Sequence, residues 1–162
     1  MRAFVTHGVI LLLVLSTMIG CRPAEPLLEF REQVEVEDEG GSGTILVWVP
    51  ATGVIDGEEV VLNSNHFKKN TYVEENPHGG GPMLCFEFTE EGSILCEQIT
   101  SRLLDKPLAI FRGEGDDAEP LLDKEGQPIA PVVKAVITDK GVISGLSLAD
   151  ANELSRLINE SP

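Results

Sequence analysis

Short runs in which apolar and polar residues alternate recur along most of the chain and predict a protein built mainly from strands. The segments with this pattern are 27–36, 44–49, 59–62, 82–89, 107–112 and 132–138. Two other segments, 90–104 and 148–158, carry apolar residues at the three- and four-residue spacing of a helix. Thr89 and Ser147 stand directly before them and are suited to cap the two helix N-termini.

Glycine, proline and acidic residues separate these segments. The stretches 37–43, 76–82 and 139–141 have the composition of turns, and the acidic stretch 113–128 has that of a solvated loop. The second half of the chain then follows the order strand, helix, strand, strand, helix, which predicts an α+β unit with helices on one sheet face. The large apolar residues expected in its core rather than in a ligand pocket are Phe86, Phe88, Ile110, Phe111, Val133 and Ile137.

The N-terminus has the organisation of a secretory signal peptide. Arg2 is the only full charge in the first twenty residues, and the apolar run 8–18 follows it. This run is too short to span a bilayer, which needs about 20 predominantly apolar residues. A charged start, a short apolar run and the small Gly20 before the cut predict that residues 1–20 are removed on export.

Cys21 directly after Gly20 resembles the lipobox of bacterial lipoproteins, in which the thiol is acylated and becomes the new N-terminus. We therefore expect lipidation at Cys21, a short proline-bearing tether over 21–26, and a body held on the extracytoplasmic face of the cell membrane. The alternative is an ordinary cleaved signal peptide followed by an incidental cysteine.

The charge of the chain limits its partners. The sequence has 27 acidic against 12 basic residues, and removal of Arg2 with the signal peptide leaves a net charge of about −16. Such a chain repels nucleic acid and anionic lipid headgroups, so we expect no nucleic-acid partner and no polybasic membrane binding. The lipid would be the anchor.

The two remaining cysteines are predicted to be free thiols. Cys85 alternates with Leu84 and Phe86 on a strand and so points away from their apolar face. Cys96 lies on the apolar stripe of the first helix. A helix packed on the Phe86 face would leave the two sulfur atoms on opposite sides of the sheet.

Candidate catalytic and metal-binding residues do not form a complete site. The run 78–81 (HGGG) matches the oxyanion-hole motif of some esterases, but the chain lacks the Gly-x-Ser-x-Gly nucleophile motif, which favours a linker. His66 and His78 have no arranged partners for zinc and are expected to be exposed loop residues. The acids of 114–125 miss the EF-hand spacing. We predict no catalytic residue, no cofactor, no metal and no enzyme activity.

An ordered set of short segments resembles the first large extracytoplasmic (periplasmic) domain of SecD, the accessory subunit of the bacterial Sec translocon. The matching segments are 28–32, 52–53, 81–82, 86–89, 91–92, 99–100, 106–111, 130–133 and 143–145. The resemblance implies a small, mostly β base over 27–81 and a ferredoxin-like head subdomain over 82–162.

The chain departs from this family in three respects. The membrane helices that carry the charged residues of proton coupling are absent, 114–127 looks like an acidic insertion, and the sequence ends at Pro162 after the last helix. The resemblance therefore implies a stand-alone, non-catalytic module that binds protein and assists export, with Sec translocon components or exported polypeptides as partners. The expected contact surface is the insertion 113–128 and the sheet face of Met83 and Cys85. The alternative is an envelope-scaffolding lipoprotein without an export role.

Overall fold

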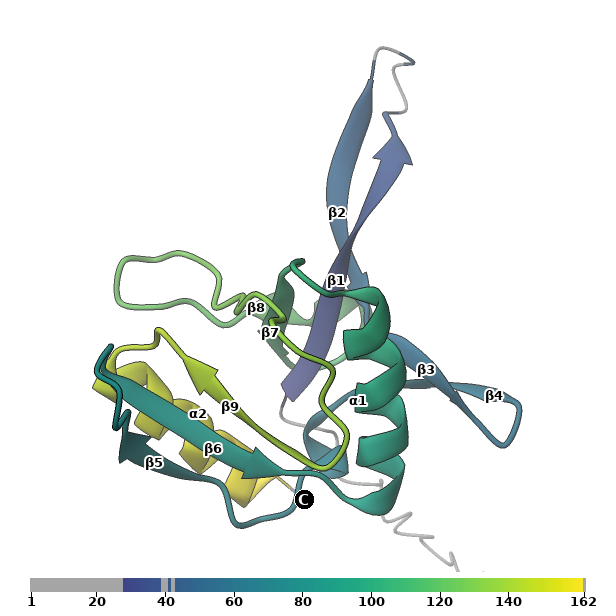
Figure 1. Ribbon diagram of the computed structural model, residues 1–162. Helices are drawn as coiled ribbons and strands as arrows, with labels where there is room; N and C mark the ends of the chain where they lie inside the picture. Colours follow the sequence, from purple (N-terminus) through teal and green to yellow (C-terminus); the bar gives the residue numbers. More distant parts are fainter. Residues whose placement is uncertain (1–27, 39–40, 42, 162) are drawn as a thin grey trace, which may run out of the picture.

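The protein is described by a computed structural model that covers residues 28–38, 41 and 43–161, so the predicted signal peptide, tether and Cys21 lie outside the described residues. Within these residues the strands are at most ten residues long, and two helices of 13 residues each accompany them (Figure 1). The α+β class is therefore confirmed. The elements are β1 Leu28–Glu37, β2 Thr44–Pro50, β3 Thr52–Ile55, β4 Glu58–Val61, the 3-10 turn η1 Ser64–His66, β5 Tyr72–Glu75, β6 Pro82–Glu87, α1 Glu90–Arg102, β7 Leu108–Arg112, the 3-10 turn η2 Gly115–Asp117, β8 Glu119–Pro120, β9 Lys140–Ser144 and α2 Leu148–Glu160.

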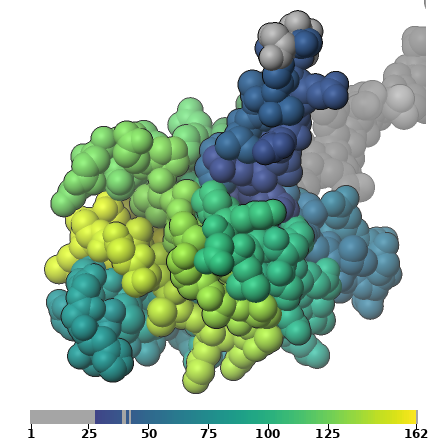
Figure 2. Space-filling model, turned by 45° about the horizontal axis from the view of Figure 1, so that its top comes forward, coloured from purple at the N-terminus to yellow at the C-terminus, as the bar shows by residue number. Residues whose placement is uncertain are grey.

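The strands form antiparallel sheets in the orders β2-β1-β7-β8, β3-β4 and β5-β6-β9. The predicted order strand, helix, strand, strand, helix counted 132–138 as its third strand, whereas the observed order is β6, α1, β7, β8, β9 and α2. In addition, β7 pairs with β1 while β6 pairs with β9. The β1–β2 hairpin projects from the body (Figures 1 and 2), because β7 covers only the first half of β1.

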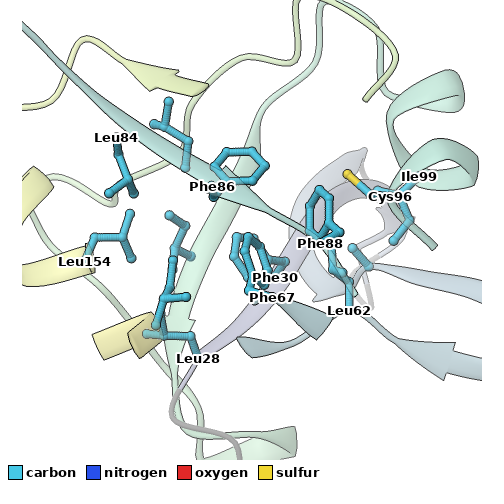
Figure 3. Close-up of a cluster of buried hydrophobic side chains, with 14 of the residues drawn as sticks. Leu28, Phe30, Leu62, Phe67, Leu84, Phe86, Phe88, Cys96, Ile99 and Leu154 are labelled. Carbon is cyan, nitrogen blue, oxygen red and sulfur yellow. The ribbon is translucent and has the colours of Figure 1, made fainter. Parts of the chain in front are cut away.

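The core lies between the two larger sheets, and at its centre a group of phenylalanine rings is surrounded by aliphatic side chains (Figure 3). Phe67, in the segment after η1, stacks on Phe30 of β1 at a centroid distance of 5.2 Å. Its other neighbours are Phe86 at 5.5 Å and Phe88 at 4.5 Å, on and just after β6. Since all four rings are buried, they hold the β1 sheet and the β6 sheet against each other.

Helix α1 begins where the sequence predicts. The Thr89 hydroxyl accepts a hydrogen bond from the backbone N–H of Gly92 at 3.1 Å, and Glu90 and Glu91 lie in the first turn, which suits the helix dipole. The buried face of α1 includes Leu95 and Ile99. Gly92 lies against η1 so closely that an added Cβ would be 2.1 Å from the carbonyl oxygen of His66.

Helix α2 is also capped as predicted and packs against β5 and β6. The Ser147 hydroxyl accepts from the N–H of Asp150 at 3.2 Å, and Leu154 is buried toward Leu84 of β6 (Figure 3). At the other end, the Lys69 ammonium donates to the carbonyl of Ile158 at 3.2 Å, where a positive charge complements the dipole of a helix C-terminus.

The prediction of a strand over 132–138 is wrong. Only Val132 takes part in a bridge, with Pro107. Val133 instead exchanges backbone hydrogen bonds with Asp105 and Lys106, which belong to the turn after α1. The N–H of Ile137 donates to the Thr100 hydroxyl of α1 at 2.9 Å, so these anchors bind the segment to a helix and a turn rather than to a strand.

The prediction of a turn at 139–141 is also wrong, because β9 begins at Lys140 and pairs with β6. Gly141 makes this pairing possible: a Cβ there would lie 2.7 Å from the Cζ atom of Phe86. The short strands β3 and β5 were not predicted, since four residues give too short a pattern; β3 also contains Gly53, and β5 ends in two acidic residues. The expected boundary between base and head, at 81–82, falls in the β5–β6 hairpin and stays a prediction.

His66 is buried, and the prediction that it is an exposed loop residue is wrong. It ends η1, where its Nδ1 accepts a hydrogen bond from the N–H of Asn63 at 3.1 Å, while the Asn63 side chain accepts from the N–H of Asn65. Burial lowers the pKa of His66 below its usual value, and its contacts with Asn63 and Glu91 offset this only in part. The neutral imidazole is thus the form that the fold contains.

We predict that Gly92→Ala destabilises the protein by about 1–3 kcal/mol, the usual cost of overpacking a core. Helix propensity alone would give the opposite sign, because alanine is favoured over glycine inside a helix by about 1 kcal/mol. Urea denaturation measures the difference, with Glu97→Ala on the exposed face of α1 as the control. A Gly92→Ala variant at least as stable as wild type would contradict the close packing of α1 on His66.

We also predict that His66 makes the free energy of unfolding fall as the pH drops below about 6.5, the ordinary histidine pKa. The unfolded chain takes up the proton at that pH, whereas the folded chain does so only at lower pH, so the stability present above pH 6.5 is lost as the pH falls through the folded pKa. Denaturation experiments at several pH values between 7.5 and 5.5 measure this dependence, and the free energy of unfolding should vary less with pH in His66→Gln than in the wild type. An unchanged slope in His66→Gln would contradict the burial of a neutral imidazole at this position.

Candidate functional site

An apolar cavity of about 420 Å³ lies beside β9, a size within the range of ordinary ligand sites. Its two walls are the loop segment 131–137 and the strand β9, 140–144, which follows it in the chain (Figure 1). In the space-filling view this loop lies at the surface next to α1 (Figure 2). We call this site the β9 cavity.

The floor of the β9 cavity is the aromatic core itself. Phe30, Phe67, Phe86 and Phe88 all line it, together with Cys96 of α1 (Figure 3). Because these side chains are fixed by packing between two sheets, the floor is rigid and apolar. An apolar side chain placed there would lose water-exposed area on several sides at once, which is favourable.

The wall formed by β9 offers unpaired backbone groups. β9 is the edge strand of its sheet, and among the described residues no other strand pairs with its free side. In an antiparallel edge strand, alternate residues direct their N–H and C=O groups outward. An extended polypeptide can bind such an edge by adding a strand.

The opposite wall is held at its ends and free in its middle. The carbonyl of Pro131 accepts from the N–H of Leu108 at 3.0 Å, and Ile137 is bound to Thr100. The intervening residues 134–136 are exposed, and no backbone hydrogen bond of theirs occurs within the described part of the chain. This wall can therefore also offer backbone donors and acceptors to a ligand.

The β9 cavity offers apolar side chains and free backbone groups, which suit binding. Cys96 lies at its floor, but burial raises the pKa of its thiol to about 12, against a smaller opposing effect of the Thr100 hydroxyl. The sulfur is thus protonated at neutral pH and is not a nucleophile. The described residues hold no group of three or more histidine, cysteine or acidic side chains placed to bind a metal.

Of the candidate site residues considered in the sequence, His66, the run 78–81 and Cys85 lie outside the lining of this cavity, whereas Cys96 is part of it. The run 78–81 forms the exposed turn between β5 and β6. Cys85 and Cys96 are both free, as predicted. Cys85 lies on the sheet face away from Phe86, where its thiol donates to Glu74 at 3.4 Å; burial first, and then Glu74, raise its pKa.

The acidic insertion 113–128 is mostly exposed, as predicted, but its start is bound to β1. The buried Glu29 carboxylate accepts from the N–H of Gly115 at 3.1 Å and from Nε of Arg31 at 2.7 Å. The Arg31 guanidinium in turn lies over the Phe111 ring at 4.6 Å. Further along, the insertion helps to line a second cavity of about 430 Å³ next to the first.

Sequence reasoning missed the β9 cavity because it assigned Phe86, Phe88, Val133 and Ile137 to the core alone. Phe86, Phe88 and Val133 are indeed buried, yet all four residues also line the cavity. The signal that could have found it is Pro131, which interrupts strand pairing just before an apolar run that has no partner strand.

Across the residues that the structure describes, no helix has both the length and the apolar character needed to cross a membrane. A scan against family models finds no match. The SecD subunit of the protein translocase of Dehalococcoides mccartyi (strain VS) is 44% identical over 134 residues, or 82% of this chain; the match spans 29% of that protein.

Two solved structures are also similar, each at 21% identity and a TM-score of 0.47 over 84% of this chain. One is SecDF, described as a membrane component that enhances protein export, with 63% of its chain covered; the other is SecDF in a Super-membrane-facing form, with 19% covered. The sequence identity over 134 residues shows that this chain contains a SecD-like domain.

Proposed function

We propose that the chain is a lipid-anchored, extracytoplasmic and non-catalytic module that binds extended polypeptide during protein export. The observation that carries the proposal is the β9 cavity, an apolar floor between two stretches of unpaired backbone, within a domain 44% identical to a protein translocase subunit. Translocon components and polypeptides in transit are the proposed partners.

The geometry favours an extended chain over a folded partner. The segment 131–137 and the edge strand β9 line the cavity on two sides, and an edge strand is a surface to which one extended segment can be added. A strand placed beside β9 would form main-chain hydrogen bonds independent of its sequence, and its alternate side chains would enter the aromatic floor. Binding many different polypeptides requires this combination.

The proposed anchor is the lipid at Cys21, supported by the run 8–18 and by Gly20 before the cysteine. The net charge of about −16 after removal of the signal peptide repels anionic headgroups, so the protein body supplies no attraction of its own to such a surface. The tether 21–26 would keep the SecD-like domain close to the site of translocation.

We predict that a photo-reactive residue at Val136 captures exported polypeptides or translocon subunits in bacterial cells. Val136 lines the β9 cavity and is 43% exposed. Ile94, on α1 and outside the cavity, has the same exposure and is the matched control. Capture at both positions alike, or of envelope proteins only, would reject the export role and favour envelope scaffolding.

We predict that Cys21→Ser abolishes incorporation of a fatty-acid label and moves the protein from the membrane to the soluble fraction. Mass spectrometry of the mature N-terminus should show an acylated Cys21 in the wild type. A Cys85→Ser variant controls for labelling at the buried internal thiol. Retention of the label or of the membrane fraction in Cys21→Ser would show that the anchor lies elsewhere.

A further inference from the structure

The charged residues that line the β9 cavity are positive, whereas the net charge of the whole chain is negative. Acidic residues outnumber basic ones by 27 to 12 in the sequence, yet the charged residues that line this cavity are Lys134 and Lys140, and none of its described lining residues is acidic. One lysine stands on each wall. Because Lys140 pairs with Glu87 while Gly141 pairs with Phe86, the Lys140 side chain lies on the face of β9 opposite the floor, where the neighbours of a floor-filling residue in an added strand also point.

Lys140 is free to meet a ligand. It stands opposite Glu87 in the pairing of β9 with β6, but the Glu87 carboxylate is bound by Lys68 at 3.0 Å. The pKa of Glu87 is lowered first by its hydrogen bonds to Lys68 and Asn70, and Lys140 contributes least of the causes. In the described ranges no carboxylate lies within 4.0 Å of the Lys140 ammonium.

Lys134 is engaged only weakly. Its ammonium lies 3.0 Å from Asp105, but the two side chains are 73% and 82% exposed. Ion pairs between such exposed groups contribute little, because water screens them and both side chains lose freedom. A carboxylate bound partly inside the cavity can therefore replace Asp105 as the partner of Lys134.

The cavity beside it has the opposite charge. It shares Pro131 and Ser144 with the β9 cavity, but its charged lining residues are Asp123, Glu125, Asp150 and Lys124. The two adjoining cavities thus separate positive from negative charge over a short distance. The lysines of the β9 cavity are a local feature rather than a general property of this side of the molecule.

We propose that the β9 cavity selects extended polypeptide segments in which an acidic residue flanks the apolar residue that enters the aromatic floor. This inference rests on the proposed function, because it assumes that the occupant is a polypeptide. The apolar side chain contacts the phenylalanine floor, the backbone pairs with β9, and the flanking carboxylate lies between Lys134 and Lys140. A segment with a basic residue at the same position brings like charges together.

The test uses amidated eight-residue peptides with a Val-Leu-Val centre, one flanking position occupied by Asp, Asn or Lys, and a fluorophore at the far end. Anisotropy titrations use the full-length chain at about 0.15 M salt, where charges more than about 8 Å apart are screened and the overall negative charge matters least. We expect the affinity order Asp, Asn, Lys, with about two- to fivefold between steps, as exposed ion pairs give.

The variants identify the source of the preference. Lys134→Gln and Lys140→Gln should each reduce the ratio of Asp to Asn affinity by about two- to fivefold. Lys124→Gln removes the same charge outside the β9 cavity and should leave that ratio unchanged. All three lysines are exposed, so the substitutions leave the core intact.

Two other outcomes are informative and distinct. Equal affinity for the three peptides, or a preference that survives both cavity variants, overturns the inference while the polypeptide-binding function stands. Absence of binding by all three peptides overturns both, because an apolar extended segment is then not a ligand of the β9 cavity.

Discussion

The packing of Phe67 against three other phenylalanines is the contact on which the rest of the structure depends. Phe67 belongs to neither large sheet, yet it stacks on Phe30 of one and touches Phe86 and Phe88 of the other. Its backbone also forms a β-bridge with Phe88, and the backbone N–H of the neighbouring Lys68 donates to the backbone carbonyl of Glu87 at 2.9 Å. Losing a buried aromatic ring costs about 3–5 kcal/mol, a large part of the stability of a small domain.

The elements whose positions depend on neighbouring residues in the sequence could be predicted from the sequence. The caps at Thr89 and Ser147 act within one helical turn, so the helix starts could be predicted from adjacent residues. β1, β2, β6 and β7 have enough alternation to be found as well. The pairing of β7 with β1 rather than with β6 was beyond such signals, because it depends on contacts between residues about 80 positions apart.

The candidate site was harder to predict for the same reason. A valine-rich run such as 132–138 favours a strand by propensity, but a strand also needs a partner, and here the backbone is bound by Thr100 and Lys106 instead. Whether the run forms a strand depends on its contacts with α1 and with the turn after α1, which lie elsewhere in the sequence. The cavity exists because this run does not close onto β9.

The aromatic floor has a consequence for how this protein can evolve. Since the rings that would contact a ligand are also those that join the two sheets, recognition and folding are thermodynamically linked: an occupant bound only to the folded state raises its stability. A change in Phe86 or Phe88 would alter both properties together. Substitutions that retune specificity without loss of fold are therefore confined to the exposed residues of the two walls, such as those at 134–136, where the chain tolerates sequence drift.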